Sequence, residues 1–375
     1  MNLFQVYPLF DVEPVKAKGN YVYDAAGQKY LDFYGGHAVI SIGHSHPHYV
    51  ERVNAQLNEI GFYSNSVPIR IQEQLAKKLG KLSGYNNWNL FLCNSGAEAN
   101  ENALKVASAQ NQRKKIIAFK GGFHGRTSLA VSVTDNPSIL FPVNEGADVI
   151  RFAFEDFEGV ESALKNEDVS SVIIEGIQGV GGIVAPSVSF LNHLRKLCNE
   201  TGTVLILDEV QSGFGRTGEF FAHQLFGVEP DIITMAKGMG NGFPVGGVFI
   251  HPKFKASFGM LGTTFGGNHL ACAASLAVLE VLEQEKLISN AKAMGRYLEA
   301  GLSQLQKVKK VRAFGLMVGV EFEEPAAEWR KKLLYEHYIF TGSSSNKNVL
   351  RLLPPLSIGK EECDELIQAL KEVLK

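Results

Sequence analysis

The sequence is poor in cysteine and shows no bias toward one sign of charge, and both absences narrow the possible functions. Its 375 residues include four cysteines, which lie far apart and form no C-x-x-C pair. This spacing argues against a disulfide framework or a thiolate zinc site and predicts reduced thiols in a cytoplasmic protein. Lysine and arginine number 37 against 39 acidic residues, a formal net charge of -2. Nucleic acids and anionic membranes favour strongly basic partners, so we expect neither here.

Long apolar runs and the commonest nucleotide and hydrolase motifs are also missing. No stretch reaches the roughly 18 apolar residues that a membrane-spanning helix needs. The first residues lack the basic start and apolar core of a signal peptide. The chain contains neither a G-x-x-x-x-G-K-[ST] phosphate loop nor a G-x-S-x-G nucleophile elbow. We therefore expect a soluble cytoplasmic protein, and the chain length suggests two domains.

The order of helical patterns and apolar runs predicts an α/β fold. Helical patterns at 48–61, 69–83, 97–110 and 188–201 are interleaved with short apolar runs, at Leu90–Leu92, Ile116–Phe119, Val172–Ile174, Val204–Leu207, Ile232–Thr234 and Gly247–Ile250. Strands separated by helices imply a mostly parallel sheet that is covered on both faces. We therefore predict one large domain over residues 48–250.

The two ends of the chain follow a different pattern. A hairpin is predicted about residues 21–33, where tyrosines alternate on both sides of a glycine-containing turn. Near the other end, a long helix from about 270 to 285, strands at 318–322 and 349–353, and a last helix at 360–374 suggest an α+β unit. Residues 1–47 and 251–375 are predicted to form this smaller domain together.

A lysine and an aspartate, each at the end of an apolar run, are the strongest chemical signal in the chain. Lys237 lies between Ala236 and Gly238, so no large side chain crowds its amine. Upstream of it, Asp208 ends another apolar run, Val204–Leu207. Enzymes that use pyridoxal 5'-phosphate (PLP) need this pair, because the lysine forms a Schiff base with the cofactor and the carboxylate holds the pyridine nitrogen protonated. The sequence therefore predicts PLP as the cofactor.

The segment Asn94–Asn100 follows a predicted strand and opens a helix. Ser95 fits an N-cap, and Glu98 three residues later completes a capping box. On its own this pattern favours an ordinary capped helix. Helix-start amides with a hydroxyl and a glycine also form an anion site, and the presence of Lys237 and Asp208 in the same chain favours a phosphate site here.

Two arginines and a glutamate are further candidates. In Gly121-Gly-Phe-His-Gly-Arg-Thr, the glycines allow Phe123 to cover a flat ligand and Arg126 to offer a fork suited to a carboxylate. Arg351 lies between two leucines of a predicted strand, either on its wet face or held for a carboxylate, and alternation alone favours the wet face. Glu175 ends another strand on the side where such sheets bind ligands, which gives it no definite role.

Two other motifs are tempting but weak. Gly213–Gly218 matches G-x-G-x-x-G, as in a nicotinamide-dependent dehydrogenase. Bulky Phe214 and Arg216 occupy its interior, and no strand ending in an acid follows about 20 residues on, so we favour a chance match. Histidines alternate in Gly43–His48, but a proline and a glycine predict a turn, and no acid or cysteine joins them. No metal site is expected.

With these residues the chain resembles the class III (ornithine/acetylornithine-type) aminotransferases of PLP fold type I. The similarity runs nearly end to end, in unchanged order, through blocks that begin at Tyr30, Gly43, Asn94, Gly122, Glu175, Asp208, Gly213, Ala236 and Thr264. The short length and Gly-Phe-His-Gly-Arg are most similar to acetylornithine and succinylornithine aminotransferases. The resemblance implies transfer of the terminal amino group of an N-acylornithine to 2-oxoglutarate, giving the N-acyl glutamate semialdehyde and glutamate, in arginine biosynthesis. The alternatives are an ornithine or other omega-amino acid aminotransferase, or an isomerase of the glutamate-semialdehyde aminomutase kind on the same fold.

The resemblance also implies roles for residues around the cofactor. Lys237 and Asp208 would be catalytic, with Lys237 moving the proton between substrate carbon and cofactor. The other cofactor-binding residues would be those that sandwich the ring, bond its phenolic oxygen, hold its phosphate or lie nearby: Val210 and Phe123, Gln211, Ser95, Gly96 and Ala97, and Glu175. Thr264 would reach the phosphate from the partner subunit, so that a homodimer shares its sites.

For the substrates, the resemblance implies two carboxylate-binding arginines. Arg351 would bind the α-carboxylate of glutamate. Arg126 would bind the carboxylate of acylornithine in one half-reaction and the distal carboxylate of glutamate in the other. Two departures from the family matter: Val180 replaces a glutamate that pairs with the arginine matching Arg351 in ornithine-type relatives, and His37 replaces an aliphatic residue near the expected site entrance. The sequence does not distinguish an acetyl from a succinyl substrate.

Overall fold

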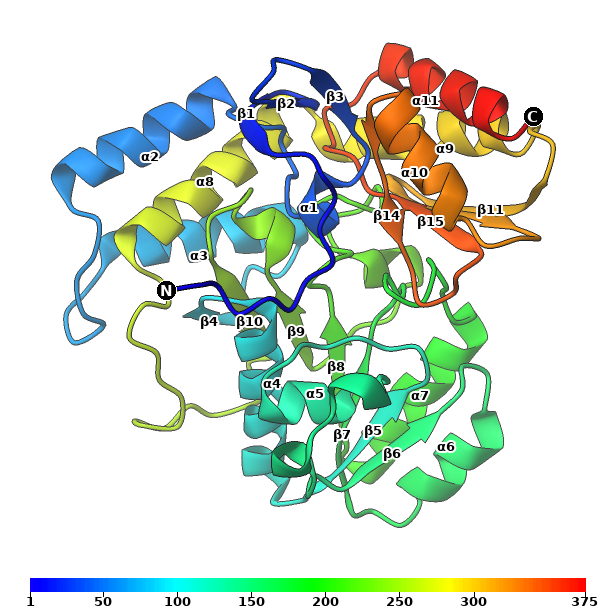
Figure 1. The fold of residues 1–375 in the computed structure, drawn as a ribbon. Helices are drawn as coiled ribbons and strands as arrows, with labels where there is room; N and C mark the ends of the chain where they lie inside the picture. Colours follow the sequence, from blue (N-terminus) through cyan, green and yellow to red (C-terminus); the bar gives the residue numbers. More distant parts are fainter.

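The large sheet of the computed structural model, which describes residues 1–375, forms the lower half of Figure 1. Its strands follow the order β4 (Asn89–Cys93), β10 (Gly246–Ile250), β9 (Ile232–Met235), β8 (Val204–Asp208), β7 (Val169–Ile174), β5 (Lys115–Phe119) and β6 (Val149–Phe152). All neighbouring pairs are parallel except those of β10, which runs antiparallel to both β4 and β9. The predicted α/β fold with a mostly parallel sheet is confirmed.

Helices cover both faces of this sheet, as its apolar strands require. Along β8, Leu205 and Leu207 pack in one cluster with α6 (Phe157–Leu164) and α7 (Val188–Thr201). The alternate residues of β8 pack in a second cluster with α4 (Gly96–Asn111). Because successive side chains of a strand point to opposite faces, a strand that is buried on both sides reads as a continuous apolar run. This is why these strands were visible in the sequence.

The direction of the strands decides where a site can form. β4 and β9 are both antiparallel to β10, so β4 is parallel to β9 and to the rest of the sheet. The residues that follow β4, β5, β7, β8 and β9 therefore meet at one edge. In open α/β sheets this carboxyl edge is where ligands bind.

Two smaller sheets lie above the large one in Figure 1. The first contains β1 (Pro14–Lys18), β2 (Tyr21–Asp24), β3 (Lys29–Asp32) and β13 (Ile339–Phe340), and β2–β3 is the predicted hairpin. The second contains β11 (Val308–Phe314), β12 (Met317–Phe322), β15 (Val349–Leu352) and β14 (Gly342–Ser343). β13 pairs in parallel with β3, so the first sheet joins both ends of the chain.

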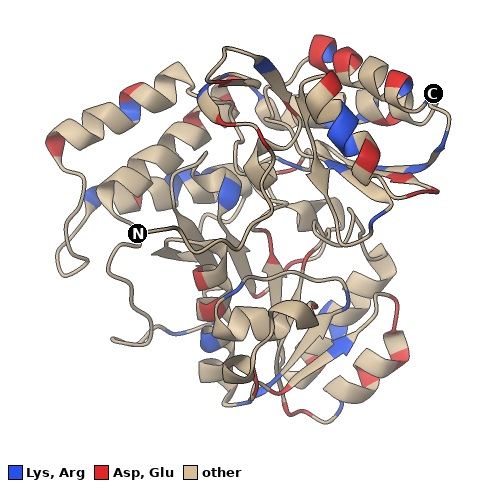
Figure 2. Cartoon of the chain, in the orientation of Figure 1, with Lys and Arg blue, Asp and Glu red and all other residues tan.

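The remaining helices surround these sheets. They are α1 (Gly35–Ala38), α2 (Pro47–Glu59), α3 (Arg70–Ser83), α5 (Ser128–Val133), α8 (His269–Gln284), α9 (Leu287–Leu302), α10 (Ala327–Glu336) and α11 (Lys360–Val373), with 3-10 turns η1 (Pro137–Ile139), η2 (Pro142–Asn144), η3 (Ala222–Leu225) and η4 (Lys237–Met239). Many charged residues lie on the outer helices and loops, and β11 of the second small sheet carries Lys309, Lys310 and Arg312 (Figure 2). No helix is both long and apolar enough to cross a membrane.

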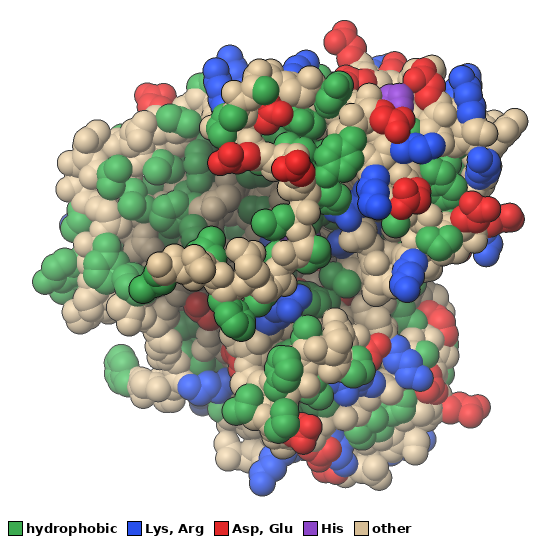
Figure 3. All heavy atoms as spheres, viewed as in Figure 1, with side chains coloured by type: hydrophobic (Ala, Val, Ile, Leu, Met, Phe, Trp, Pro, Cys, Tyr) green, Lys and Arg blue, Asp and Glu red, His purple; other side chains and the backbone are tan.

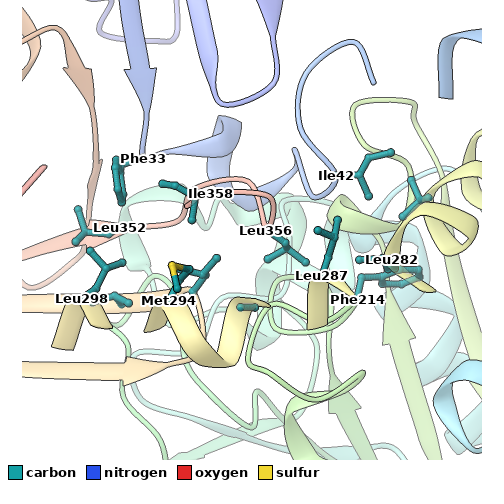
Figure 4. Close-up of a cluster of buried hydrophobic side chains, with 14 of the residues drawn as sticks. Phe33, Ile42, Phe214, Leu282, Leu287, Met294, Leu298, Leu352, Leu356 and Ile358 are labelled. Carbon is teal, nitrogen blue, oxygen red and sulfur yellow. The ribbon is translucent and has the colours of Figure 1, made fainter. Parts of the chain in front are cut away.

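The largest apolar core joins segments from the start, middle and end of the chain. Figure 4 shows Phe33 and Ile42 facing Leu352 and Leu356, with Phe214 beside the α8–α9 residues. α8 also packs against α2 and α3. This core therefore contains residues from both predicted domains. The division into 48–250 against 1–47 and 251–375 remains a prediction.

The three histidines of the early turn face separate carboxylates. His44 bonds to Asp32 at 2.8 Å. His48 bonds to Glu280 of α8, and His46 bonds to Glu285, the residue that follows this helix. α2 begins at Pro47, directly after the turn. The histidines thus tie the turn and the start of α2 to their surroundings, each through a different acid.

Candidate active site

A cavity of about 360 Å³ opens at the carboxyl edge of the large sheet. Its lining includes the predicted site residues Ser95, Gly96, Ala97, Phe123, Arg126, Glu175, Asp208, Val210, Gln211 and Lys237. Thr264 and Arg351 are not among its lining residues. The cavity therefore gathers side chains from loops after five different strands.

Lys237 follows β9 in a strained backbone conformation. Its φ is +41°, in the left-handed region that residues other than glycine rarely adopt. Burial lowers the pKa of its amine to about 8, although the charges of Asp208 and Glu175 oppose this shift. A lysine with this pKa has a substantial fraction of neutral, nucleophilic amine near neutral pH.

This pKa predicts how fast the amine forms a covalent bond with an added pyridoxal aldehyde. Only the neutral amine reacts, so the rate for cofactor-free protein should rise about tenfold per pH unit below pH 8 and level off above it. Stopped-flow absorbance from pH 6 to 10 with excess PLP measures this rate. A rate that keeps rising to pH 10 would show that the amine keeps the ordinary lysine pKa.

Asp208 is held by two side chains that the sequence had not singled out. Its Oδ2 accepts hydrogen bonds from His124 Nδ1 and Asn100 Nδ2, both at 2.8 Å, and its Oδ1 accepts from the Val210 amide at 3.0 Å. Thr234 donates to the Asn100 oxygen and fixes that amide. The carboxylate is thus oriented by donors on both oxygens.

His124 supplies charge as well as a hydrogen bond. Burial alone would lower the pKa of this imidazole, but the hydrogen bond to Asp208 and the negative charge of that carboxylate outweigh burial and raise it. A protonated His124 keeps its partner ionised. His124 and Asn100 both lie inside sequence blocks that had been noticed, and only their facing toward Asp208 was not evident.

The start of α4 has the features of an anion site. Ser95 is the N-cap, with its Oγ accepting from the Glu98 amide at 3.2 Å, and the Glu98 carboxylate accepts from the Asn94 amide. The predicted N-cap Ser95 is confirmed, but the capping box is not complete, because Glu98 accepts from the amide of Asn94 and not from that of Ser95. The amides of Gly96 and Ala97 have no partner within the helix, and they line the cavity at its positive end.

Two glycines permit close packing at this end of the cavity. A Cβ on Gly96 would lie 2.6 Å from Val210 Cγ1, and one on Gly125 would lie 2.8 Å from the Ala97 Cβ. These two glycines therefore allow the start of α4 to pack closely against Val210 and against the loop that carries Gly125. Free amides, a serine and a close backbone are the donor set that binds phosphate esters, so these residues fit the phosphate of PLP.

Glu175 acts through other parts of the site. One of its oxygens accepts from the Phe123 amide at 2.9 Å and the other from the Gly179 amide at 3.0 Å. Burial raises the pKa of this carboxyl, and the charge of His124 partly opposes the change. Glu175 thus joins the loop after β5, which carries Phe123, to the loop after β7, which carries Val180.

Arg351 is buried, so the solvent-exposed position that strand alternation alone favoured is wrong. It is 4% exposed; its Nε donates to the Ser343 carbonyl and its Nη1 to Gln211 Oε1 at 3.5 Å. Gly342 lies between the Tyr34 ring and Arg351, because a Cβ on this glycine would touch both. Alternation along a strand shows which face is apolar, but it does not show whether the other face is covered.

Gln211 connects Arg351 to the segment that contains His37. Its Nε2 donates to the His37 carbonyl at 3.2 Å. The His37 ring hydrogen-bonds to the Tyr34 hydroxyl, and burial with the charges of Lys237 and two arginines lowers its pKa to about 4. His37 is therefore neutral at physiological pH. Of the two arginines, Arg126 lines the cavity, and Arg351 has Ser343 and Gln211 as its partners rather than an acid.

Comparison with known proteins gives consistent matches over the whole chain. The family model described as "Aminotransferase class-III" matches residues 5–374. The acetylornithine aminotransferase of Methanocaldococcus jannaschii is 41% identical over 98% of this chain and 95% of its own. That of Bacillus subtilis is 39% identical over 100% and 97%. The solved ornithine aminotransferase from Toxoplasma gondii superimposes with a TM-score of 0.92 at 28% identity, covering 99% of this chain and 92% of that one.

Proposed function

Because this chain belongs to the class III aminotransferases, a family of PLP-dependent enzymes, we propose that it transfers the terminal amino group of an N-acylornithine to 2-oxoglutarate. The products are the N-acyl glutamate semialdehyde and glutamate, as in arginine biosynthesis. Curated relatives at about 36–41% identity over the full length carry the name acetylornithine aminotransferase. The observation that carries the proposal is a cavity lined by a reactive lysine, an oriented aspartate and Arg126, with Arg351 bonded to the lining residue Gln211.

The cofactor fits the residues of this cavity. The Ser95, Gly96 and Ala97 end would hold the phosphate, Val210 and Phe123 would flank the ring, and Gln211 would lie near its phenolic oxygen. PLP, when bound, supplies an electron sink that stabilises negative charge on the substrate carbon.

The protein supplies proton transfer and orientation. Lys237 Nζ would move the proton between the substrate carbon and the cofactor. The Asp208 carboxylate holds the proton on the pyridine nitrogen, and His124 and Asn100 keep that carboxylate in place. Arg126 and Arg351 bind the carboxylates, so each substrate presents its amine or carbonyl carbon to Lys237.

Val180 is central to the choice of substrate. It lines the cavity where ornithine-type relatives have an acid, and Arg351 forms no ion pair. An open Arg351 suits glutamate, but it would also hold free ornithine by its α-carboxylate and present the wrong amine. An N-acylornithine avoids this misbinding because its α-nitrogen is blocked.

We therefore expect a kcat/KM for N-acetylornithine or N-succinylornithine at least about 100-fold above that for ornithine, as removal of a well-aligned contact costs about that much. Val180→Glu should raise δ-transamination of ornithine several-fold by pairing with Arg351. Val180→Gln is the matched control, because glutamine has the size of the introduced glutamate but no charge. Equal kcat/KM values for ornithine and its acyl derivatives in the unmodified enzyme would contradict the proposal and favour an ornithine aminotransferase.

The two half-reactions separate this function from the isomerase alternative. Bound PLP should lose its visible absorbance when N-acylornithine or glutamate is added and regain it with 2-oxoglutarate. An aminomutase would convert one compound into its isomer without needing 2-oxoglutarate. Turnover that continues without any keto acid would therefore contradict the aminotransferase assignment.

We also propose a homodimer with shared sites. Thr264 is exposed and lies outside the cavity of its own chain. The rings of its neighbour Phe265 and of Phe62 have centroids 5.5 Å apart, and Leu57, Tyr63 and Phe258 are further large apolar side chains that are exposed. Figure 3 shows hydrophobic side chains gathered over α2 and the N-terminal segment. A second copy covering this surface would bring Thr264 to the partner's phosphate site, and sedimentation velocity should give twice the 41.0 kDa chain mass.

The cysteines support a cytoplasmic location for the enzyme. All four are unpaired and buried. Proteins of oxidising compartments more often pair their cysteines in disulfides. Thiol titration of the protein purified without reductant and then denatured should therefore detect four free thiols.

A further inference from the structure

The Gly213–Gly218 loop, which matched a dinucleotide motif by chance, has a structural role that centres on Arg216. The loop starts two residues after Gln211, and Phe214, Gly215 and Gly218 have positive φ values. Phe214 enters the large core beside Leu282 and Leu287 (Figure 4). A Cβ on Gly215 would lie 2.7 Å from Ile288, so this glycine permits a close approach to α9. The glycines therefore serve packing and turning of the loop.

Arg216 is a buried cation without a carboxylate partner. It is 2% exposed and forms no ion pair, and burial lowers its pKa to about 9, which leaves it charged at neutral pH. A buried charge that is not neutralised is costly unless its donors are well satisfied. Its hydrogen bonds all go to backbone carbonyls: Nη1 to Leu316 (3.1 Å) and to Pro354, and Nη2 to Ile40 (3.4 Å).

Those carbonyls belong to segments that carry site residues. Ile40 follows Val39, which lines the cavity. Pro354 lies three residues after Arg351. Leu316 is in the turn that joins β11 to β12, the strand that pairs with β15. The planar guanidinium fork thus holds three parts of the chain at fixed distances from the loop that follows Asp208 and Gln211.

Other contacts show how closely these segments fit. The Leu316 amide donates to the Arg216 carbonyl at 2.9 Å. Arg216 and Leu316 are therefore joined by two hydrogen bonds, since the Arg216 side chain also donates to the Leu316 carbonyl. A Cβ on Gly315 would lie 2.7 Å from the Arg216 oxygen. The Leu353 amide donates to Phe33 O and the Leu356 amide to Ser41 O. These contacts leave little freedom for β15 to shift against the N-terminal segment.

We propose that Arg216 is a positioning residue that fixes the distance between Arg351 and the cofactor-binding edge of the large sheet. It thereby sets how a substrate carboxylate held by Arg351 aligns its reacting carbon with Lys237. This inference rests on the proposed function, because it takes Arg351 as the site for the α-carboxylate of glutamate. Lysine in its place would keep the charge but could not reach carbonyls of all three segments in one plane.

The test is the first half-reaction of Arg216→Lys with two donors. We expect the KM for glutamate to rise about 10- to 100-fold, since misplacement by about 1 Å has effects of this size. The rate with 1,5-diaminopentane, which has no carboxylate, should stay unchanged. Arg195→Lys is the matched control, because Arg195 is also largely buried but bonds to Asp231 and Glu229 away from the cavity.

The outcomes separate the two ideas. If the wild-type enzyme does not use glutamate, the proposed function fails whatever Arg216 does. If the wild type uses glutamate and Arg216→Lys has an unchanged KM, or loses activity equally with both donors, the positioning role is overturned. Should Arg216→Lys fail to fold, Gly315→Ala displaces the same turn from the other side and must give the same selective rise in KM for glutamate.

Discussion

Lys237→Ala should abolish transamination, lowering kcat by at least about 10⁴-fold, while the protein stays folded. No other lysine lines the cavity. Alanine removes both the amine that bonds to the cofactor and the base that moves the proton. The purified variant should also lack the visible absorbance of covalently bound PLP.

The control for this variant is Lys196→Ala, which removes an exposed lysine of α7 that pairs only with Glu200. Its kcat and spectrum should equal those of the wild type. Coupled assay of N-acylornithine turnover and an absorbance scan measure both variants. Ordinary turnover by Lys237→Ala would refute the role of this residue.

Asp208→Asn should lower the rate of the chemical step about 10³-fold and leave PLP bound, because the phosphate end and Lys237 are intact. An amide has nearly the shape of the carboxylate but cannot hold the pyridine nitrogen protonated by its charge. The loss should appear in single-turnover rates with glutamate rather than in the KM. Near wild-type single-turnover rates would contradict the assignment.

The same variant should change His124 in a way that is measured separately. The pKa of this imidazole is raised because Asp208 outweighs burial. Without the negative charge burial dominates, so His124 should become neutral at pH 7 and its ring NMR signals should shift accordingly. Asp231→Asn is the matched control: it removes another buried carboxylate, paired with Arg195 and Lys253, and should lower the Tm without lowering kcat.

Much of the site could be predicted because strand ends in a parallel sheet meet at one edge. Ser95, Glu175, Asp208 and Lys237 each follow an apolar run, and the fold needs only the strand order to bring them together. The antiparallel direction of β10 could not be predicted, because an apolar run has no direction. β6 was missed because it is a partly buried edge strand that carries Arg151, so it lacks a continuous apolar pattern.

The residues that were missed depend on contacts between distant elements. Asn100 reaches Asp208 because of how α4 is rotated against β8 and β9, and small differences in that rotation decide which side chain faces the sheet. Arg351 is buried and bonds to Gln211, which lies 140 positions earlier in the chain. Sequence periodicity describes one element at a time, so neither contact was visible in it.

The parallel pairing of β3 with β13 has a consequence for how the protein is made. Leu31 pairs with Ile339, so the first hairpin leaves the ribosome long before its partner strand exists. At about 5–20 residues per second, this hairpin waits roughly 15–60 s with its apolar side open. The large sheet with Asp208 and Lys237 is synthesised during that wait. The nascent chain therefore completes the edge with Asp208 and Lys237 first, and it gains Arg351, the second of the two arginines proposed to bind carboxylates, only when translation is almost finished.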